Sequence, residues 1–278
     1  MPTDAFEELT VLLTYTIAIG LFHALCVVLL SSNQLPHHKR IYRTCFYVWV
    51  VILPVMIGAA LSAVFQLSDT IEHRWQGTTP ASYLFLRIYC ALNILSTLQE
   101  FYEWYREGGT LLSKLPTLVH HFVSILVYSL CLVVYRERLH YFACLDGLCE
   151  FTTVHLTILQ WSKLKNNAAA VWLQKHCNFI FLLNGCLLWL TYIVFRLMLF
   201  PYWGYTWYTD IFQLDSAFIE GIGIQVWLCP AVTFFLFVLS VMWFHKIHTG
   251  MMKALNSGAT GLEEGDDNRH HGKVAKKE

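Results

Sequence analysis

Charged side chains are scarce in this sequence. They make up 14% of the 278 residues, whereas roughly a quarter of the residues in soluble domains are charged. Hydrophobic residues reach 56%, and the mean hydropathy is +0.48. This composition excludes an ordinary soluble domain and predicts an integral membrane protein. The 19 basic and 19 acidic residues cancel, so net charge favours neither nucleic acid nor an acidic partner.

Paired cysteines are also missing. None of the nine cysteines belongs to a Cys-x-x-Cys motif, and most fall inside apolar runs, as Cys26, Cys90 and Cys131 do. We therefore expect neither a disulfide framework nor a zinc ribbon. The first residues, MPTDAFEELT, lack the basic region and cleavage site of a signal peptide, so we expect the first apolar segment to remain in the mature protein.

Long apolar segments are abundant, and each is close to the roughly 20 residues that cross a bilayer. A spanning segment must satisfy its own backbone hydrogen bonds, and no period-two barrel pattern is present, so we expect helices. The predicted fold is an all-α integral membrane protein with seven transmembrane helices in residues 1–254 and a disordered cytosolic tail in 255–278. The expected spans are 9–30, 45–67, 81–102, 115–135, 139–161, 177–200 and 221–244.

Basic residues alternate between the connections and give an orientation. The first, third and fifth connections and the C-terminal flank carry lysine and arginine, whereas the second and fourth are balanced and the sixth has neither. We expect the N-terminus to be lumenal or outside and the C-terminus cytosolic. The sixth connection, PYWGYTWYTDIFQLD, is rich in aromatic residues and should form an interfacial belt or a short re-entrant turn. Lys276 and Lys277 resemble a dilysine retrieval signal, which favours the endoplasmic reticulum.

Histidines gather in the cytosolic half of the predicted membrane. His120 and His121 lie roughly 8 Å from the start of span four, at the helix rise of about 1.5 Å per residue, and His155 lies at a similar depth in span five. Ionisable groups are expensive in lipid and usually mark a site. Because the unperturbed pKa of histidine lies near neutrality, such a group can accept and return a proton within one turnover.

Acidic and basic residues complete the candidate site. Asp146 and Glu150 are four residues apart and are expected to share one face of span five, where a carboxylate can orient an imidazole. The candidate catalytic residues are His120, His121, Asp146 and Glu150. The candidate substrate-binding or supporting residues are Glu100, His155, Arg87 and Arg196.

Several of these residues also have a structural interpretation. A single membrane histidine such as His155 often joins two helices by a hydrogen bond, the His-His pair could lie at the membrane interface, and Asp146 with Glu150 could form an ion-pair network with an arginine. A seven-helix zinc hydrolase would need three histidines and an acidic residue around a metal. His245 and His248 are its candidates, but they are three residues apart, where that family has four. A receptor is a further alternative, although the connections leave little extracellular domain.

The order of these features resembles the TLC-domain family, which includes ceramide synthases and translocon-associated proteins. The resemblance covers roughly residues 41–248 and is carried by LQEFYEWY, by the His-His pair, by GLCEFTTVHL and by FRLMLFPYW. In ceramide synthases the paired histidines, which match His120 and His121, are implicated in acyl transfer from acyl-CoA to a sphingoid base. Asp146 and Glu150 reproduce an aspartate and a glutamate of the family's downstream motif.

The resemblance implies a membrane protein that handles lipids, with acyl transfer from acyl-CoA to a lipid amine or hydroxyl as the sharper hypothesis. The chain departs from the ceramide synthases at Phe142 and Ala143, where they carry a His-Asp pair. The alternative is therefore a non-enzymatic lipid sensor or regulator of membrane composition. The expected partners are a membrane lipid and acyl-CoA as co-substrate, without nucleic acid, bound cofactor or metal. Homo-oligomerisation stays open.

Overall fold

The computed structural model describes residues 2–30, 37–107, 111–134, 137–162 and 168–256, and no strand occurs among them. The prediction of seven helical spans is confirmed. The expected tail, 255–278, lies outside the described residues except for its first two. The helices that are long and apolar enough to cross a membrane cover Ala5–Leu29, Phe46–Leu67, Ile71–Arg106, Lys114–Val133, His140–Ser162, Phe179–Ile211 and Gln225–Lys253.

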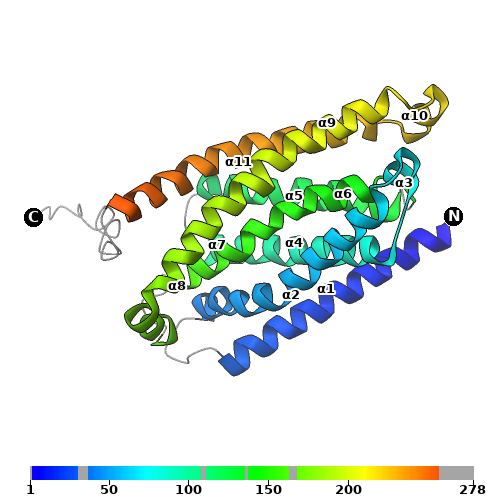
Figure 1. Ribbon diagram of the computed structural model, residues 1–278. Coiled ribbons are helices and arrows are strands. Elements are labelled where there is room, and N and C mark those ends of the chain that lie inside the picture. Colours follow the sequence, from blue (N-terminus) through cyan, green and yellow to red (C-terminus); the bar gives the residue numbers. More distant parts are fainter. Residues whose placement is uncertain (1, 31–36, 108–110, 135–136, 163–167, 257–278) are drawn as a thin grey trace, which may run out of the picture.

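The spans run alternately in opposite directions along one bundle (Figure 1). The N-terminal end of the first helix and the C-terminal end of the last helix lie at opposite ends of this bundle, as an odd number of spans requires. The helices are α1 (Pro2–Leu30), α2 (His37–Leu67), α3 (Ile71–Gln76), α4 (Pro80–Glu107), α5 (Leu111–Val133), α6 (His140–Gly147), α7 (Phe151–Ser162), α8 (Ala168–Tyr192), α9 (Leu199–Ile211), α10 (Ser216–Ile222) and α11 (Gln225–Asn256).

The sixth connection differs from the expected belt or re-entrant turn, because it continues span six as the helix α9. Trp203, Trp207 and Asp210 are buried and lie on one face, at the spacing of successive helical turns. Both oxygens of Asp210 accept hydrogen bonds from Arg74, at 2.6 and 2.7 Å, and the indole of Trp75 donates a third at 3.1 Å. This inner face connects α9 to α3.

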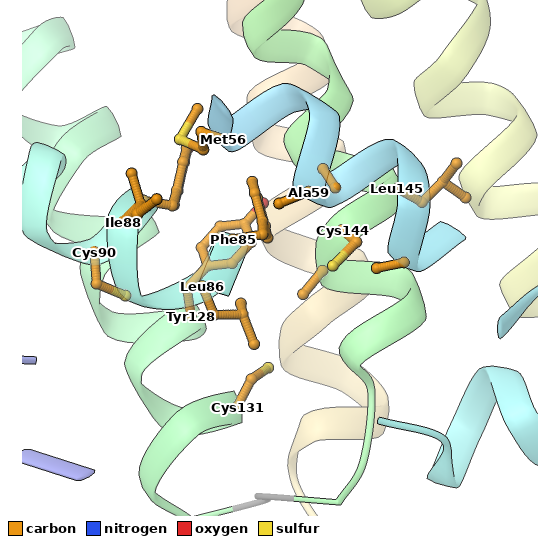
Figure 2. Packing of buried hydrophobic residues seen from close by; sticks show 14 of the residues in the cluster. Met56, Ala59, Phe85, Leu86, Ile88, Cys90, Tyr128, Cys131, Cys144 and Leu145 are labelled. Atoms are coloured by element: carbon orange, nitrogen blue, oxygen red, sulfur yellow. The ribbon is translucent and has the colours of Figure 1, made fainter. Parts of the chain in front are cut away.

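The hydrophobic core lies between α2, α4, α5 and α6. Figure 2 shows Met56 of α2, Phe85 of α4, Tyr128 of α5 and Cys144 of α6 packed together. Cys144 is free, as is every other cysteine whose side chain the structure describes. The free thiols agree with the expected absence of a disulfide framework in these parts of the chain.

Two spans depart from regular α-helix near their middle. In span five a 3₁₀ segment, η1 (Leu148–Glu150), separates α6 from α7, and in span six a π-helical segment, η2 (Ile193–Met198), separates α8 from α9. The two segments contact each other. Gly147, just before η1, lies against the ring of Phe85 so closely that an added Cβ would overlap it. Irregular turns of this kind are frequent at functional sites.

Candidate functional site

A cavity of about 470 Å³ lies between the spans, within the roughly 300–1,000 Å³ that is usual for small-molecule sites. Its walls come from the N-terminal parts of α2 and α5, the C-terminal parts of α4, α8 and α11, all of α7, and the two irregular segments η1 and η2. Apolar and aromatic side chains alternate with polar ones along these walls. Because polar groups inside a membrane bundle are costly, a lining of this kind indicates a binding site.

His121 is held by a hydrogen bond between two helices. Its Nδ1 lies 2.7 Å from Oδ1 of Asn93 on α4, and Nδ2 of Asn93 donates to the carbonyl oxygen of Tyr89 at 2.9 Å. Since the amide oxygen can only accept, Nδ1 carries the hydrogen. In the neutral ring, Nε2 is then left with its lone pair. His121 is thereby set up to accept a proton at Nε2, and both His121 and Asn93 line the cavity.

His120 also lines the cavity, but in the described part of the chain no hydrogen bond like that between His121 and Asn93 orients its ring. It is 8% exposed, and its Nδ1 has no hydrogen-bond partner among the described residues. The ring lies 5.4 Å from that of His121 and is edge-on to Trp243 at 6.0 Å, both measured between centroids. A buried ring nitrogen without a protein partner suits a group that binds a ligand.

Glu150 and Arg196 lie at the meeting point of η1 and η2. Both line the cavity, both side chains are 8% exposed, and Oε1 of Glu150 lies 3.9 Å from Nη2 of Arg196. Thr153 donates to Oε2 of Glu150 at 2.5 Å. The Nε of Arg196 donates to the hydroxyl of Thr152 at 2.8 Å. The two threonines, both in the first turn of α7, therefore fix the direction of both charged groups.

Glu100 lies in the wall of the cavity and is paired with Lys114 on α5. The Nζ of Lys114 is 2.8 Å from Oε2 of Glu100 and 3.1 Å from Oε2 of Glu103. This three-residue network joins the end of α4 to the start of α5. Glu100 is thus placed in the wall of the candidate site, where it shares the single positive charge of Lys114 with Glu103.

Three predicted site residues lie away from the cavity. Asp146 and Glu150 do not share a face: Asp146 accepts a hydrogen bond from Tyr128 at 2.7 Å and lines a separate, water-sized cavity of about 20 Å³. The physical reason is η1, because a 3₁₀ segment turns about 120° per residue instead of the roughly 100° of an α-helix. Over three residues this rotates Glu150 by about 60° relative to Asp146.

The other two residues outside the cavity have structural partners. His155 exchanges hydrogen bonds with Asn184 on α8: its Nδ1 lies 3.0 Å from Oδ1, and its carbonyl oxygen accepts from Nδ2 at 2.9 Å. Arg87 pairs with Glu8 on α1, at 2.7 Å between Nη2 and Oε1. Each of these pairs joins two helices, which is the structural interpretation of such groups.

Asn93 is the most informative residue that the sequence analysis missed. Tyr89, Asn93, Ser96 and Glu100 follow one another at helical spacing on α4, and all of them line the cavity. This polar stripe within an otherwise apolar segment was a detectable signal. Thr152 and Thr153, which follow Glu150, were a weaker signal of the site, because threonine is common in membrane helices as a partner of backbone carbonyls.

No group of three or more histidine, cysteine, aspartate or glutamate side chains is placed to hold a metal ion in the part of the chain that the structure describes. His248 accepts a hydrogen bond from the indole of Trp189 at 3.2 Å. Among the described residues, His245 and His248 are thus not accompanied by the additional ligands of a catalytic zinc site.

Comparison with protein families finds a family model described as the TLC domain, which matches residues 6–249 and so reaches from α1 to α11. No curated protein and no solved structure matches the chain.

Proposed function

The chain belongs to the TLC-domain family, which links it to lipid metabolism or sensing in membranes, and from this premise we propose that it transfers an acyl chain from acyl-CoA to an amine or hydroxyl of a membrane lipid. One observation carries the proposal: His121, with Nδ1 fixed by Asn93, lines a largely apolar cavity that also has polar side chains in its wall. A base held in one tautomer beside a space for substrate is the arrangement that proton abstraction needs.

The proposed reaction balances as follows. The nitrogen or oxygen of the acceptor lipid forms a bond to the thioester carbon, while Nε2 of His121 takes the acceptor's proton. The π electrons of the carbonyl move to its oxygen, and a tetrahedral intermediate results. When the carbonyl re-forms, the carbon–sulfur bond breaks, and His121 returns the proton to the departing thiolate. The products are an amide or ester and the free thiol of CoA.

The walls of the cavity suit such substrates. Leu92, Leu156 and Leu188 offer apolar surface to an acyl chain, and Phe46 and Trp161 form a stacked pair at 5.0 Å. The same walls carry polar side chains beside the two histidines, among them Asn93, Ser96 and Thr117. A lipid whose reactive head lies near His121, with its chain along the leucines, would satisfy both kinds of surface.

A turnover assay tests the proposal. Purified protein in lipid bilayers is supplied with long-chain acyl-CoA and a panel of long-chain bases and glycerolipids, and products are identified by mass spectrometry. Wild type should form an acylated lipid together with free CoA, and His121→Gln should reduce the rate by roughly 10²- to 10⁴-fold, the contribution of a general base. Equal product from wild type and from the His120→Ala/His121→Ala double variant rules out this chemistry.

One observation favours the alternative of a lipid sensor or regulator of membrane composition. No carboxylate in the described ranges forms a hydrogen bond or ion pair with His120 or His121, and Asp146 lies outside their cavity. A sensor needs the cavity but not a carboxylate-assisted base. It predicts saturable lipid binding without acylated product, and binding that tolerates both histidine changes.

A further inference from the structure

Arg196 is a buried arginine that makes unusually few hydrogen bonds. It is 6% exposed, lies in the π-helical segment η2 and lines the cavity. Its Nε donates to Thr152, but Oε1 of Glu150 is 3.9 Å from Nη2, which is beyond hydrogen-bond distance. Both terminal amino groups therefore lack an acceptor within the described part of the chain. Guanidinium groups this deeply buried normally have their hydrogens satisfied.

The hydrogen bonds of the residues beside Arg196 explain why its terminal amino groups have no acceptor within the described ranges. The Oε2 atom of Glu150 accepts a hydrogen bond from Thr153, at 2.5 Å, which directs the carboxylate toward the first turn of α7. Thr152 donates its own hydroxyl hydrogen to the carbonyl oxygen of Cys149, so its oxygen is free to accept from Nε of Arg196. The guanidinium lies 5.5 Å from the ring centroid of Tyr192, but its terminal amino groups have no hydrogen-bond acceptor among the described residues, in the wall of the cavity that also contains His121.

The charges of Glu150 and Arg196 restrict which kind of ligand group can bind to the terminal amino groups of Arg196. Glu150 already supplies one negative charge near Arg196, so a carboxylate or phosphate ligand would place two negative charges beside one guanidinium in a region of low dielectric constant. A neutral carbonyl oxygen accepts the same hydrogen bonds without this repulsion. Such an oxygen is uncharged while the substrate binds and gains negative charge only when its carbon is attacked, which is when preorganised donors stabilise it most strongly.

We infer that Arg196 binds the carbonyl oxygen of the acyl group and stabilises it as an oxyanion while His121 removes the proton of the acceptor. This inference rests on the proposed acyl transfer and gives the cavity two sides, a base on α5 and an oxyanion donor on η2. Removing one such donor typically lowers kcat by about 10²- to 10³-fold. Arg196→Gln should therefore lower kcat by this factor and change KM much less.

Infrared spectroscopy of a bound analogue tests the inference directly. The probe is a long-chain acyl-CoA analogue in which a methylene replaces the thioester sulfur and the carbonyl carries ¹³C. Hydrogen bonds from a guanidinium lower the carbonyl stretching frequency, so the band of the analogue bound to wild type should lie below its position in buffer. The shift should disappear in Arg196→Gln and persist in His121→Gln. Arg138→Gln, which changes an arginine that donates to Gly221 on α10, is the control and should keep both the shift and turnover.

The outcomes separate this inference from the proposed function. If wild type turns over acyl-CoA but the band of the bound analogue is the same in Arg196→Gln, the inference is wrong and the proposed function stands. If wild type neither binds the analogue nor forms product, both fail. Should Arg196→Gln not fold, Arg196→Lys carries the test, because it keeps the charge but lacks the planar pair of amino groups. It should show a smaller shift than wild type, and an unchanged shift would contradict the inference.

Discussion

The Nδ1 of His121 on α5 lies 2.7 Å from the amide oxygen of Asn93 on α4. A second pair of the same two residue types, His155 and Asn184, joins α7 to α8 outside the cavity at 3.0 Å. The two pairs share their chemistry and differ in where they lie. This difference is why we propose a role in the reaction for His121 and a role in helix packing for His155.

Asn93→Ala should lower kcat by about 10- to 100-fold, a part of the 10²- to 10⁴-fold that a general base contributes, because the tautomer and direction of His121 are then no longer fixed. Asn184→Ala should lower thermal stability and leave kcat per folded molecule close to that of wild type. Both variants are measured in bilayers by product formation and by thermal unfolding. Wild-type rates in Asn93→Ala would contradict the orienting role.

Glu150→Ala should destabilise the protein by about 3–5 kcal/mol, because it leaves Arg196 buried without its counter-charge. The Glu150→Ala/Arg196→Ala double variant should lose less than the sum of the single losses, with a coupling of about 0.5–3 kcal/mol. Unfolding of the four proteins in detergent measures this coupling. Strictly additive losses would show that the 3.9 Å approach of the two groups has no energetic consequence.

Gly147→Ala should destabilise by about 1–3 kcal/mol, because the added Cβ overlaps the buried ring of Phe85 and forces α6 away from α4. The matched control is Gly185→Ala on α8, whose added Cβ has no atom within 4 Å. That change should be neutral or stabilising by up to about 1 kcal/mol, since alanine favours helix over glycine. Relief of the Gly147→Ala loss by a second change, Phe85→Leu, would locate the strain. Equal effects of the two alanines would contradict this packing.

Asp210→Ala should lower stability by about 3–5 kcal/mol, because it removes both hydrogen bonds to the arginine and leaves Arg74 without its partner. The control is Asp215→Ala, which removes an exposed helix cap and should cost about 0.5–2 kcal/mol. Neither residue lines the cavity, so the product formed per folded molecule should not change. A selective loss of turnover in Asp210→Ala, without loss of stability, would show that α9 acts on the site.

Much of the fold follows from hydropathy, because bilayer thickness sets the length of each apolar segment. The seven spans and the TLC-domain family were predicted, and the structure and the family match confirm both. The helix α9 was missed because aromatic content was taken as a sign of the interface. Its period was the better signal: Trp203, Trp207 and Asp210 recur at helical spacing, and tyrosines occupy the exposed face.

For the candidate site, the sequence predicts how deep a residue lies in the membrane but not the direction in which its side chain points. Of the histidines expected at matched depth, His120 and His121 line the cavity and His155 does not. The predicted residues Glu150 and Arg196 also line it. The prediction that Asp146 shares a face with Glu150 was wrong, because the sequence carries no signal for the 3₁₀ turn in the middle of this span. Pairs across distant helices, such as Arg87 with Glu8, depend on packing that no single segment encodes.

Photo-crosslinking tests most directly the central claim that this cavity is the place where the acyl-CoA substrate binds. A long-chain acyl-CoA with a diazirine near the thioester is irradiated with the protein in bilayers, and the labelled residues are identified by peptide mass spectrometry. We predict adducts on cavity-lining residues of α4, α5 and α7, in the peptides that contain Asn93, His121 and Thr153, and their loss when unlabelled acyl-CoA competes. Adducts confined to the lipid-facing sides of α1 and α8, unaffected by the competitor, would contradict the claim.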